Sequence, residues 1–140
     1  MNIHPTTLQA RLLYIQKEKV TMTTKEIATA LANYCREGLW AKAQQEFYAE
    51  DIISIEPYAT DNFEKETRGL KNILAKGDKF QSLVEEMHSI EVGEPILAEN
   101  SFAFVMTMDV TMKGKDRFKM PELCVYSLRD GKVITEQFYV

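Results

Sequence analysis

Hydrophobic positions recur with the period of a helix in the first half of the chain and with the period of a strand in the second half. Leu8, Leu12 and Ile15 share one stripe, which predicts a short amphipathic helix over residues 5–19. The pattern of a compact domain then starts afresh at residue 22. We interpret 22–140 as one domain, preceded by an extension that is either an accessory helix or the product of an alternative start codon.

Three helices are expected within the domain. The first begins with Thr23 and Glu26, which have the spacing of a capping box, and ends at Gly38. A short second helix is expected over 39–47. The third runs from Leu70 to about Glu86, with a break at Gly77.

Strands dominate the remainder of the domain. Ile52 to Glu56 reads as an early strand ended by Pro57, and a polar loop over 58–68 follows it. After the third helix, the period predicts four strands, at about 88–97, 101–113, 116–128 and 132–140. Their short, turn-rich connections make neighbouring strands antiparallel, and helices followed by a meander indicate an α+β fold.

Each of the last three predicted strands has one face of large apolar residues. The strand over 101–113 carries Phe102, Phe104, Met106, Met108, Val110 and Met112 on one side. The corresponding sets in the next two strands are Phe118, Met120, Cys124, Tyr126 and Leu128, followed by Ile134, Phe138 and Val140. These faces need a cover, and the predicted helices can provide it.

Three glutamates interrupt these apolar faces. Glu122 and Glu136 lie within the sets just described, and Glu56 shares a face with Ile52 and Ser54. A carboxylate in such a place is unfavourable unless it is paired, hydrogen-bonded or protonated, so the covered face is expected to enclose a pocket. A bulge or a solvated strand end is the alternative explanation. We favour a solvated edge for Glu136 and leave both explanations open for Glu56 and Glu122.

Composition narrows the classes of partner. The net charge of −4, without a cluster of Lys or Arg, disfavours nucleic acid and anionic membranes as partners. Apolar runs are shorter than the ~20 residues of a membrane-spanning helix. Two distant cysteines and the lack of an export signal predict reduced thiols and a cytoplasmic protein.

Motifs of other chemistries are missing from the sequence. It has no phosphate-binding glycine loop, serine-triad signature or zinc motif, and no cofactor or metal is expected. Cys124 has no histidine at a spacing typical of a cysteine nucleophile. Tyr34 lies on the apolar stripe of the first helix, where a core tyrosine is the ordinary interpretation.

Several short segments appear in the order typical of one protein family. They are Phe47-Tyr48-Ala49-Glu50-Asp51, Ile55-Glu56-Pro57, Arg68-Gly69, Tyr126-Ser127-Leu128-Arg129-Asp130-Gly131-Lys132-Val133 and Glu136-Gln137-Phe138-Tyr139. Over roughly 24–140 the chain resembles the nuclear transport factor two-like superfamily, and in particular its SnoaL-like polyketide cyclase and ketosteroid isomerase branch. The resemblance implies a cystatin-like α+β cone: a curved antiparallel sheet wrapped around helices, with a pocket inside.

The resemblance also implies roles for individual residues. Glu56 stands where ketosteroid isomerases carry their general base, and Tyr34 resembles their tyrosine that donates to the oxyanion. Cys124 occupies the place of the second, protonated acid, and Glu122 is the next inward residue, so the chain departs from the family there. Phe104, Met106, Met108, Phe118, Met120 and Phe138 are expected to form the apolar walls of the pocket. Cys124 and Glu136 are expected to line it beside them.

Two functions are compatible with these observations. One is a cofactor-free isomerase or cyclase that removes a proton next to the carbonyl of a small hydrophobic compound. The other is a non-catalytic ligand-binding or dimerisation domain. A homodimer is expected in either case, through the outer sheet face that carries Ala103, Val105 and Thr107.

Overall fold

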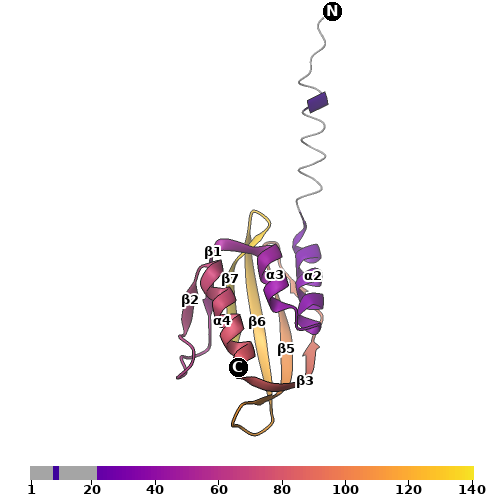
Figure 1. Cartoon of the computed structure of the whole chain (residues 1–140). Coiled ribbons are helices and arrows are strands. Elements are labelled where there is room, and N and C mark those ends of the chain that lie inside the picture. Colours follow the sequence, from indigo (N-terminus) through magenta and orange to yellow (C-terminus); the bar gives the residue numbers. More distant parts are fainter. Residues whose placement is uncertain (1–7, 10–21) are drawn as a thin grey trace, which may run out of the picture.

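Within residues 22–140, three helices lie over one face of a curved, unclosed mixed sheet (Figure 1). The computed structural model describes residues 8–9 and 22–140. The helices are α2 (Thr24–Arg36), α3 (Trp40–Phe47) and α4 (Leu70–Leu83). The helix expected over 5–19 falls outside the described residues, apart from Leu8 and Gln9.

Helix α2 begins and ends as its sequence predicts. The Thr23 hydroxyl accepts a hydrogen bond from the Glu26 amide at 3.1 Å, and the Glu26 carboxylate accepts one from the Thr23 amide at 3.2 Å. At the other end, Gly38 adopts a φ of 71°. This conformation, which favours glycine, lets the amide of Leu39 reach back to the carbonyl of Tyr34 and close the helix.

The N-cap of α2 provides a simple test of stability. Replacing Thr23 with alanine removes the acceptor for an otherwise unpaired helix amide, and we expect it to lower the free energy of unfolding by about 1 kcal/mol. Thr23→Ser keeps the hydroxyl and is expected to retain most of that stability. Urea denaturation monitored by circular dichroism measures both values, and equal losses in the two variants would contradict the capping assignment.

Helix α4 differs from the prediction in two ways. It passes through Gly77 without a break, and it ends at Leu83 rather than near Glu86. A single helical glycine costs roughly 0.5–1 kcal/mol relative to alanine, and a continuous helix keeps both Ile73 and Phe80 packed on the core. The helix ends where Val84 begins to pair with Met112 in the sheet.

Within residues 22–140 the sheet contains seven strands in the order β2-β1-β7-β6-β5-β3, with β4 paired to β5. Their bounds are β1 (Tyr48–Ile55), β2 (Glu66–Arg68), β3 (Val84–Val92), β4 (Ile96–Leu97), β5 (Ser101–Met112), β6 (Phe118–Arg129) and β7 (Lys132–Tyr139). The predicted antiparallel pairing of β5, β6 and β7 is confirmed. Strand β1 pairs in parallel with β7, so the first and the last of the long strands are neighbours.

Some strand boundaries were predicted wrongly. The early strand starts at Tyr48 instead of Ile52, and the end of the supposed loop forms β2 against β1. The strand expected over 88–97 begins earlier and is split into β3 and β4 around Gly93 and Pro95. Proline provides no amide hydrogen for a ladder, which accounts for the interruption.

The alternation of β5 was predicted correctly. Phe102, Phe104, Met106, Met108 and Val110 are all buried on its helix-facing side. In β7 the buried hydrophobic residue is Val133 instead of Ile134, because the register with β6 shifts between Ser127 and Leu128. The core therefore lies between α2, α3 and α4 and the inner faces of β5, β6, β7 and β1.

Candidate functional site

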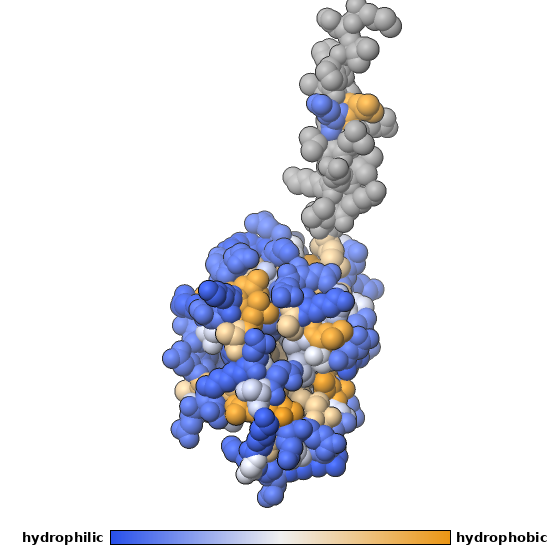
Figure 2. Space-filling view, viewed as in Figure 1, coloured by the Kyte–Doolittle hydropathy of each residue, from blue (hydrophilic) through white to orange (hydrophobic). Residues whose placement is uncertain are grey.

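A cavity of about 930 Å³ lies between the helices and the inner face of the sheet. Its walls come from α3, α4, the loop after β1, and strands β5, β6 and β7. Five of the predicted wall residues line it: Met106, Met108, Phe118, Met120 and Phe138. Trp40, Phe80 and Tyr126, which were not predicted as wall residues, line it as well. The surface over the helices is mostly polar and is broken by several apolar patches (Figure 2).

The structure brings together three of the predicted site acids. Glu56 after β1, Glu122 in β6 and Glu136 in β7 all line this cavity. Tyr34, Phe104 and Cys124 are not among its lining residues. Phe104 and Cys124 are instead enclosed in the core, with exposed fractions of 2% and 0%.

Glu136 is the most deeply buried of these three acids. The expectation of a solvated edge was wrong, because β7 lies between β1 and β6 and the side chain is only 4% exposed. The Tyr48 hydroxyl donates to its Oε2, and the Ser54 hydroxyl donates to its Oε1 at 2.8 Å. Burial raises the pKa of Glu136, while these two hydrogen bonds act in the opposite direction.

Lys76 of α4 joins this group to Glu56. Its Nζ lies 2.6 Å from Oε1 of Glu56 and donates to the Ser54 hydroxyl at 3.2 Å. Each side chain of the ion pair is about one-fifth exposed, 20% for Lys76 and 21% for Glu56. A continuous polar network therefore runs from Tyr48 through Glu136, Ser54 and Lys76 to Glu56.

Of the three predicted site acids in the cavity, Glu122 is the one without a polar partner. It is half-buried, and its carboxylate has no hydrogen-bond partner within 22–140. Burial first, and then the negative charge of Glu56, raises the pKa of Glu122 to about 7, against the effect of Lys76. Near neutral pH this group can therefore either donate or accept a proton.

Tyr34 has a different environment. Its hydroxyl donates to Oε2 of Glu46 at 2.6 Å, at the surface between α2 and α3. Its ring packs at 6.1 Å from Phe47, and Nζ of Lys42 lies 5.5 Å from its centre. The tyrosines that do line the cavity are Tyr48, Tyr58 and Tyr126.

The two cysteines are buried thiols. Burial raises the pKa of Cys35 to about 12, and it raises the pKa of Cys124 further still. Both thiols therefore remain protonated at neutral pH. Nucleophilic chemistry at Cys124 finds no support here.

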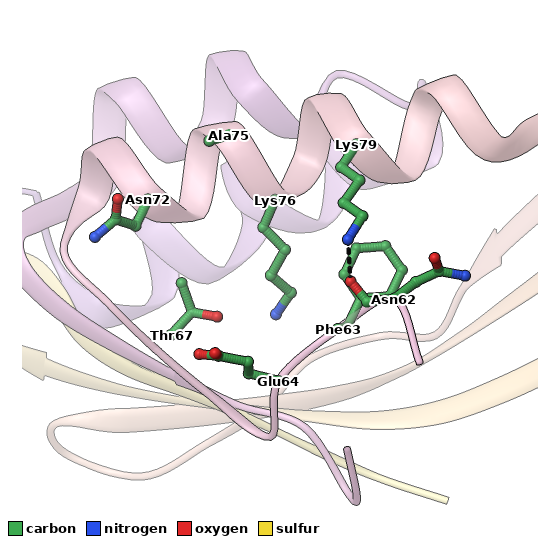
Figure 3. A pocket seen from close by; sticks show the side chains of 8 residues that line it. All are labelled: Asn62, Phe63, Glu64, Thr67, Asn72, Ala75, Lys76 and Lys79. Atoms are coloured by element: carbon green, nitrogen blue, oxygen red, sulfur yellow. Dashed lines mark hydrogen bonds between the residues drawn. The ribbon is translucent and has the colours of Figure 1, made fainter. Parts of the chain in front are cut away.

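A smaller cavity of about 240 Å³ lies on the other side of Lys76, between α4 and the loop before β2 (Figure 3). Lys76 and Lys79 both point from the helix toward this loop. Lys79 donates to the carbonyl of Asn62, and its Nζ lies 5.2 Å from the centre of the Phe63 ring. Three residues line both cavities: Asn62, Phe63 and Lys76. The loop that Lys79 holds at Asn62 therefore lies between the two cavities.

Two residues of the site, Lys76 and Tyr48, were not predicted from the sequence. Lys76 occupies the apolar stripe of its helix, between Ile73 and Phe80, and this pattern is the same signal that singled out the acids. Tyr48 had no such signal, because it lies at the boundary between α3 and β1, where the period changes.

Among the residues that the structure describes, no group of three or more His, Cys, Asp or Glu is placed to hold a metal ion. No helix in the same residues is long and apolar enough to cross a membrane.

The family model of the SnoaL-like domain matches residues 22–140. A crystal structure from Mesorhizobium loti, provisionally described as a SnoaL-like polyketide cyclase, is 30% identical, with a TM-score of 0.78. The match covers 85% of this chain and 100% of that one. The search of curated proteins found no match.

More distant structures share the fold alone. A protein of unknown function with a cystatin-like fold from Xanthomonas campestris is 16% identical, covers 84% of this chain and 90% of its own, and has a TM-score of 0.72. A protein with a ketosteroid isomerase-like fold from Catenulispora acidiphila, solved with trimethylamine, is also 16% identical. That match covers 85% of this chain and 87% of the Catenulispora chain, with a TM-score of 0.65. These matches confirm the predicted α+β cone.

Proposed function

Since this chain belongs to the SnoaL-like domain family, we propose that it is a cofactor-free isomerase or cyclase acting on a small hydrophobic carbonyl compound. The substrate binds in the large cavity, Glu56 removes a proton from the carbon next to the carbonyl, and Glu122 donates a hydrogen bond to the carbonyl oxygen. Tyr34, outside the cavity, has no role in this scheme.

The observation that carries this proposal is the difference between two acids in one cavity. Glu122 has a pKa of about 7, so a substantial share of it is protonated near neutral pH and can donate to an oxygen. Glu56 is paired with Lys76 at 2.6 Å and supplies the acceptor for the proton. Aromatic and methionine side chains around them suit a hydrophobic substrate.

Hydrogen–deuterium exchange tests the proposal without knowledge of the natural substrate. 2-Tetralone is a small hydrophobic ketone with exchangeable protons next to its carbonyl, and proton NMR follows their replacement in D₂O. We expect the protein to accelerate this exchange above the rate in buffer. Tight binding of the ketone, detected through the fluorescence of the single Trp40 in the cavity wall, without faster exchange would contradict the proposed reaction.

A non-catalytic ligand-binding domain is the second candidate. The observation in its favour is the ion pair itself, because Lys76 satisfies the Glu56 carboxylate without any ligand. In that case Lys76, Glu56 and Glu136 stabilise the cavity wall through their mutual contacts. Ligand binding then changes the Trp40 fluorescence, while the exchange rate of the ketone stays at its value in buffer.

We also propose that two copies associate through the outer face of the sheet. Val105, Leu123 and Tyr139 pair across three adjacent strands and are 48%, 41% and 46% exposed. Light scattering after gel filtration is expected to give a dimer, and Leu123→Lys a monomer, because the substitution places two ammonium groups in the interface. Ala59→Lys, in the exposed loop after β1, is expected to remain dimeric. A monomeric wild-type protein at high concentration would contradict this assembly.

A further inference from the structure

We propose that Lys76 is a further catalytic residue that binds the carbonyl oxygen of the substrate as it becomes negatively charged. The site then selects compounds in which an ionisable C–H bond is directly next to a carbonyl, attached to a hydrophobic body. This inference rests on the proposed function, and it gives Lys76 a part that the family resemblance had implied for Tyr34.

The position of the ammonium group provides the first argument. Nζ of Lys76 lies 2.6 Å from Oε1 of Glu56. In a carbonyl compound, the oxygen and the adjacent carbon are about 2.4 Å apart, as bond lengths of about 1.23 and 1.52 Å require. A substrate can therefore present its C–H bond to Glu56 and its oxygen to Lys76 at the same time.

The charge balance of the step provides the second argument. Before the reaction, Lys76 faces the carboxylate of Glu56. Glu56 then takes the proton and becomes neutral, the electron pair of the broken C–H bond forms the new carbon–carbon double bond, and the carbonyl π electrons move to oxygen. The ammonium group of Lys76 thus faces one negative charge before the step, on the Glu56 carboxylate, and one after it, on the substrate oxygen. The negative charge therefore stays next to Lys76 throughout the step.

The surroundings of Lys76 provide the third argument. The Ser54 hydroxyl accepts from Nζ and donates in turn to Glu136, which Tyr48 also holds. Nζ lies 5.9 Å from the centre of the Phe138 ring, within the apolar wall. Ser54 and Glu136 therefore act as positioning residues that hold the ammonium group in the cavity wall.

Lys79 provides a matched control one turn further along α4. It is bound to the carbonyl of Asn62 and to the Phe63 ring, and it does not line the large cavity (Figure 3). A nonspecific effect of removing positive charge from α4 would appear equally in Lys79→Met and Lys76→Met.

2-Naphthol is a suitable probe, because its anion has the planar ring system of the enolate that 2-tetralone would form. At a pH below the pKa of free 2-naphthol, absorbance reports the ionised fraction in the bound state, and titration gives the affinity. We expect the wild-type protein to bind 2-naphthol in part as the anion and to bind 2-methoxynaphthalene, which cannot ionise, at least tenfold more weakly.

The variants give a distinctive pattern. Lys76→Met is expected to lose the preference for 2-naphthol, whereas Lys79→Met keeps it. Glu56→Gln is expected to bind the anion more tightly than the wild type, because Lys76 is released from its carboxylate. Lys76→Arg retains the charge and is expected to keep the preference, which separates loss of the cation from a folding defect. An unchanged preference in Lys76→Met would overturn the inference.

The same variants separate this inference from the proposed function. Lys76→Met is expected to lower the exchange rate of bound 2-tetralone by about 10²-fold, as for the loss of one oxyanion donor. The wild type could bind the naphthol anion through Lys76 and yet not accelerate exchange. That outcome would refute the proposed reaction and support the anion-binding role of Lys76. If the wild type accelerates exchange and Lys76→Met exchanges at the same rate, the catalytic role of Lys76 is refuted and the proposed reaction is supported.

Discussion

Replacing Glu56 with glutamine is expected to lower the rate of 2-tetralone exchange by about 10²–10⁴-fold, the range typical of a lost general base. Glutamine has nearly the same shape but cannot accept the proton. The ketone still finds its apolar walls and Lys76, so its affinity, measured through Trp40 fluorescence, is expected to change much less than the exchange rate.

Glu64→Gln is the matched control for this experiment. Glu64 is exposed in the loop that follows Glu56, and it faces the smaller cavity instead of the large one (Figure 3). Its removal is expected to leave exchange at the wild-type rate. If Glu56→Gln also exchanges at the wild-type rate, with an unchanged melting temperature, another group is the base and the scheme fails.

Replacing Glu122 with glutamine is expected to stabilise the protein at pH 8 by up to about 3 kcal/mol. The folded state raises the pKa of Glu122 from its ordinary 4.5 to about 7, so the folded protein binds this proton more tightly than the unfolded chain does. Glu122 therefore has no effect on the free energy of unfolding below about pH 4.5. Its destabilising effect grows as the pH rises and is complete above about pH 7. Glutamine removes this penalty because it never ionises.

The measurement is a pair of urea denaturation curves at pH 5 and pH 8. We expect a much larger difference between Glu122→Gln and the wild type at pH 8 than at pH 5, where the carboxyl is mostly protonated when folded. Glu91→Gln, at an exposed position of β3, is expected to leave stability unchanged at both values. A difference of equal size at pH 5 and pH 8 would show that packing, and not ionisation, is responsible.

Local patterns in the sequence were sufficient for much of the fold. The alternation in β5 and the capping box of α2 depend on neighbouring residues, so both could be predicted. The parallel pair of β1 and β7 depends on strands about eighty residues apart and leaves no local signal. That pair is also the reason Glu136 is buried, so the prediction of a solvated edge failed for a non-local cause.

The candidate site shows the same division. Glu56 and Glu122 could be placed in the cavity because a charged residue in an apolar stripe is visible in the sequence. Lys76 carries the same signal, but the expected break at Gly77 obscured it. The distance of 2.6 Å between Lys76 and Glu56 requires α4 to lie across the end of β1, a packing arrangement that periodicity cannot predict.

The parallel pairing of β1 with β7 has a consequence for the order of folding. Strand β7 lies between β1 and β6, so β1 cannot join the β5–β6 pair until the strand furthest along the chain has been inserted. The bonds from Tyr48 and Ser54 of β1 to Glu136 form only at that moment. Such long-range closure is typically slow, because the chain loses the conformational entropy of a large loop before any stabilising contact forms. The polar network is therefore expected to assemble in the last step of folding, together with the cavity whose wall it forms.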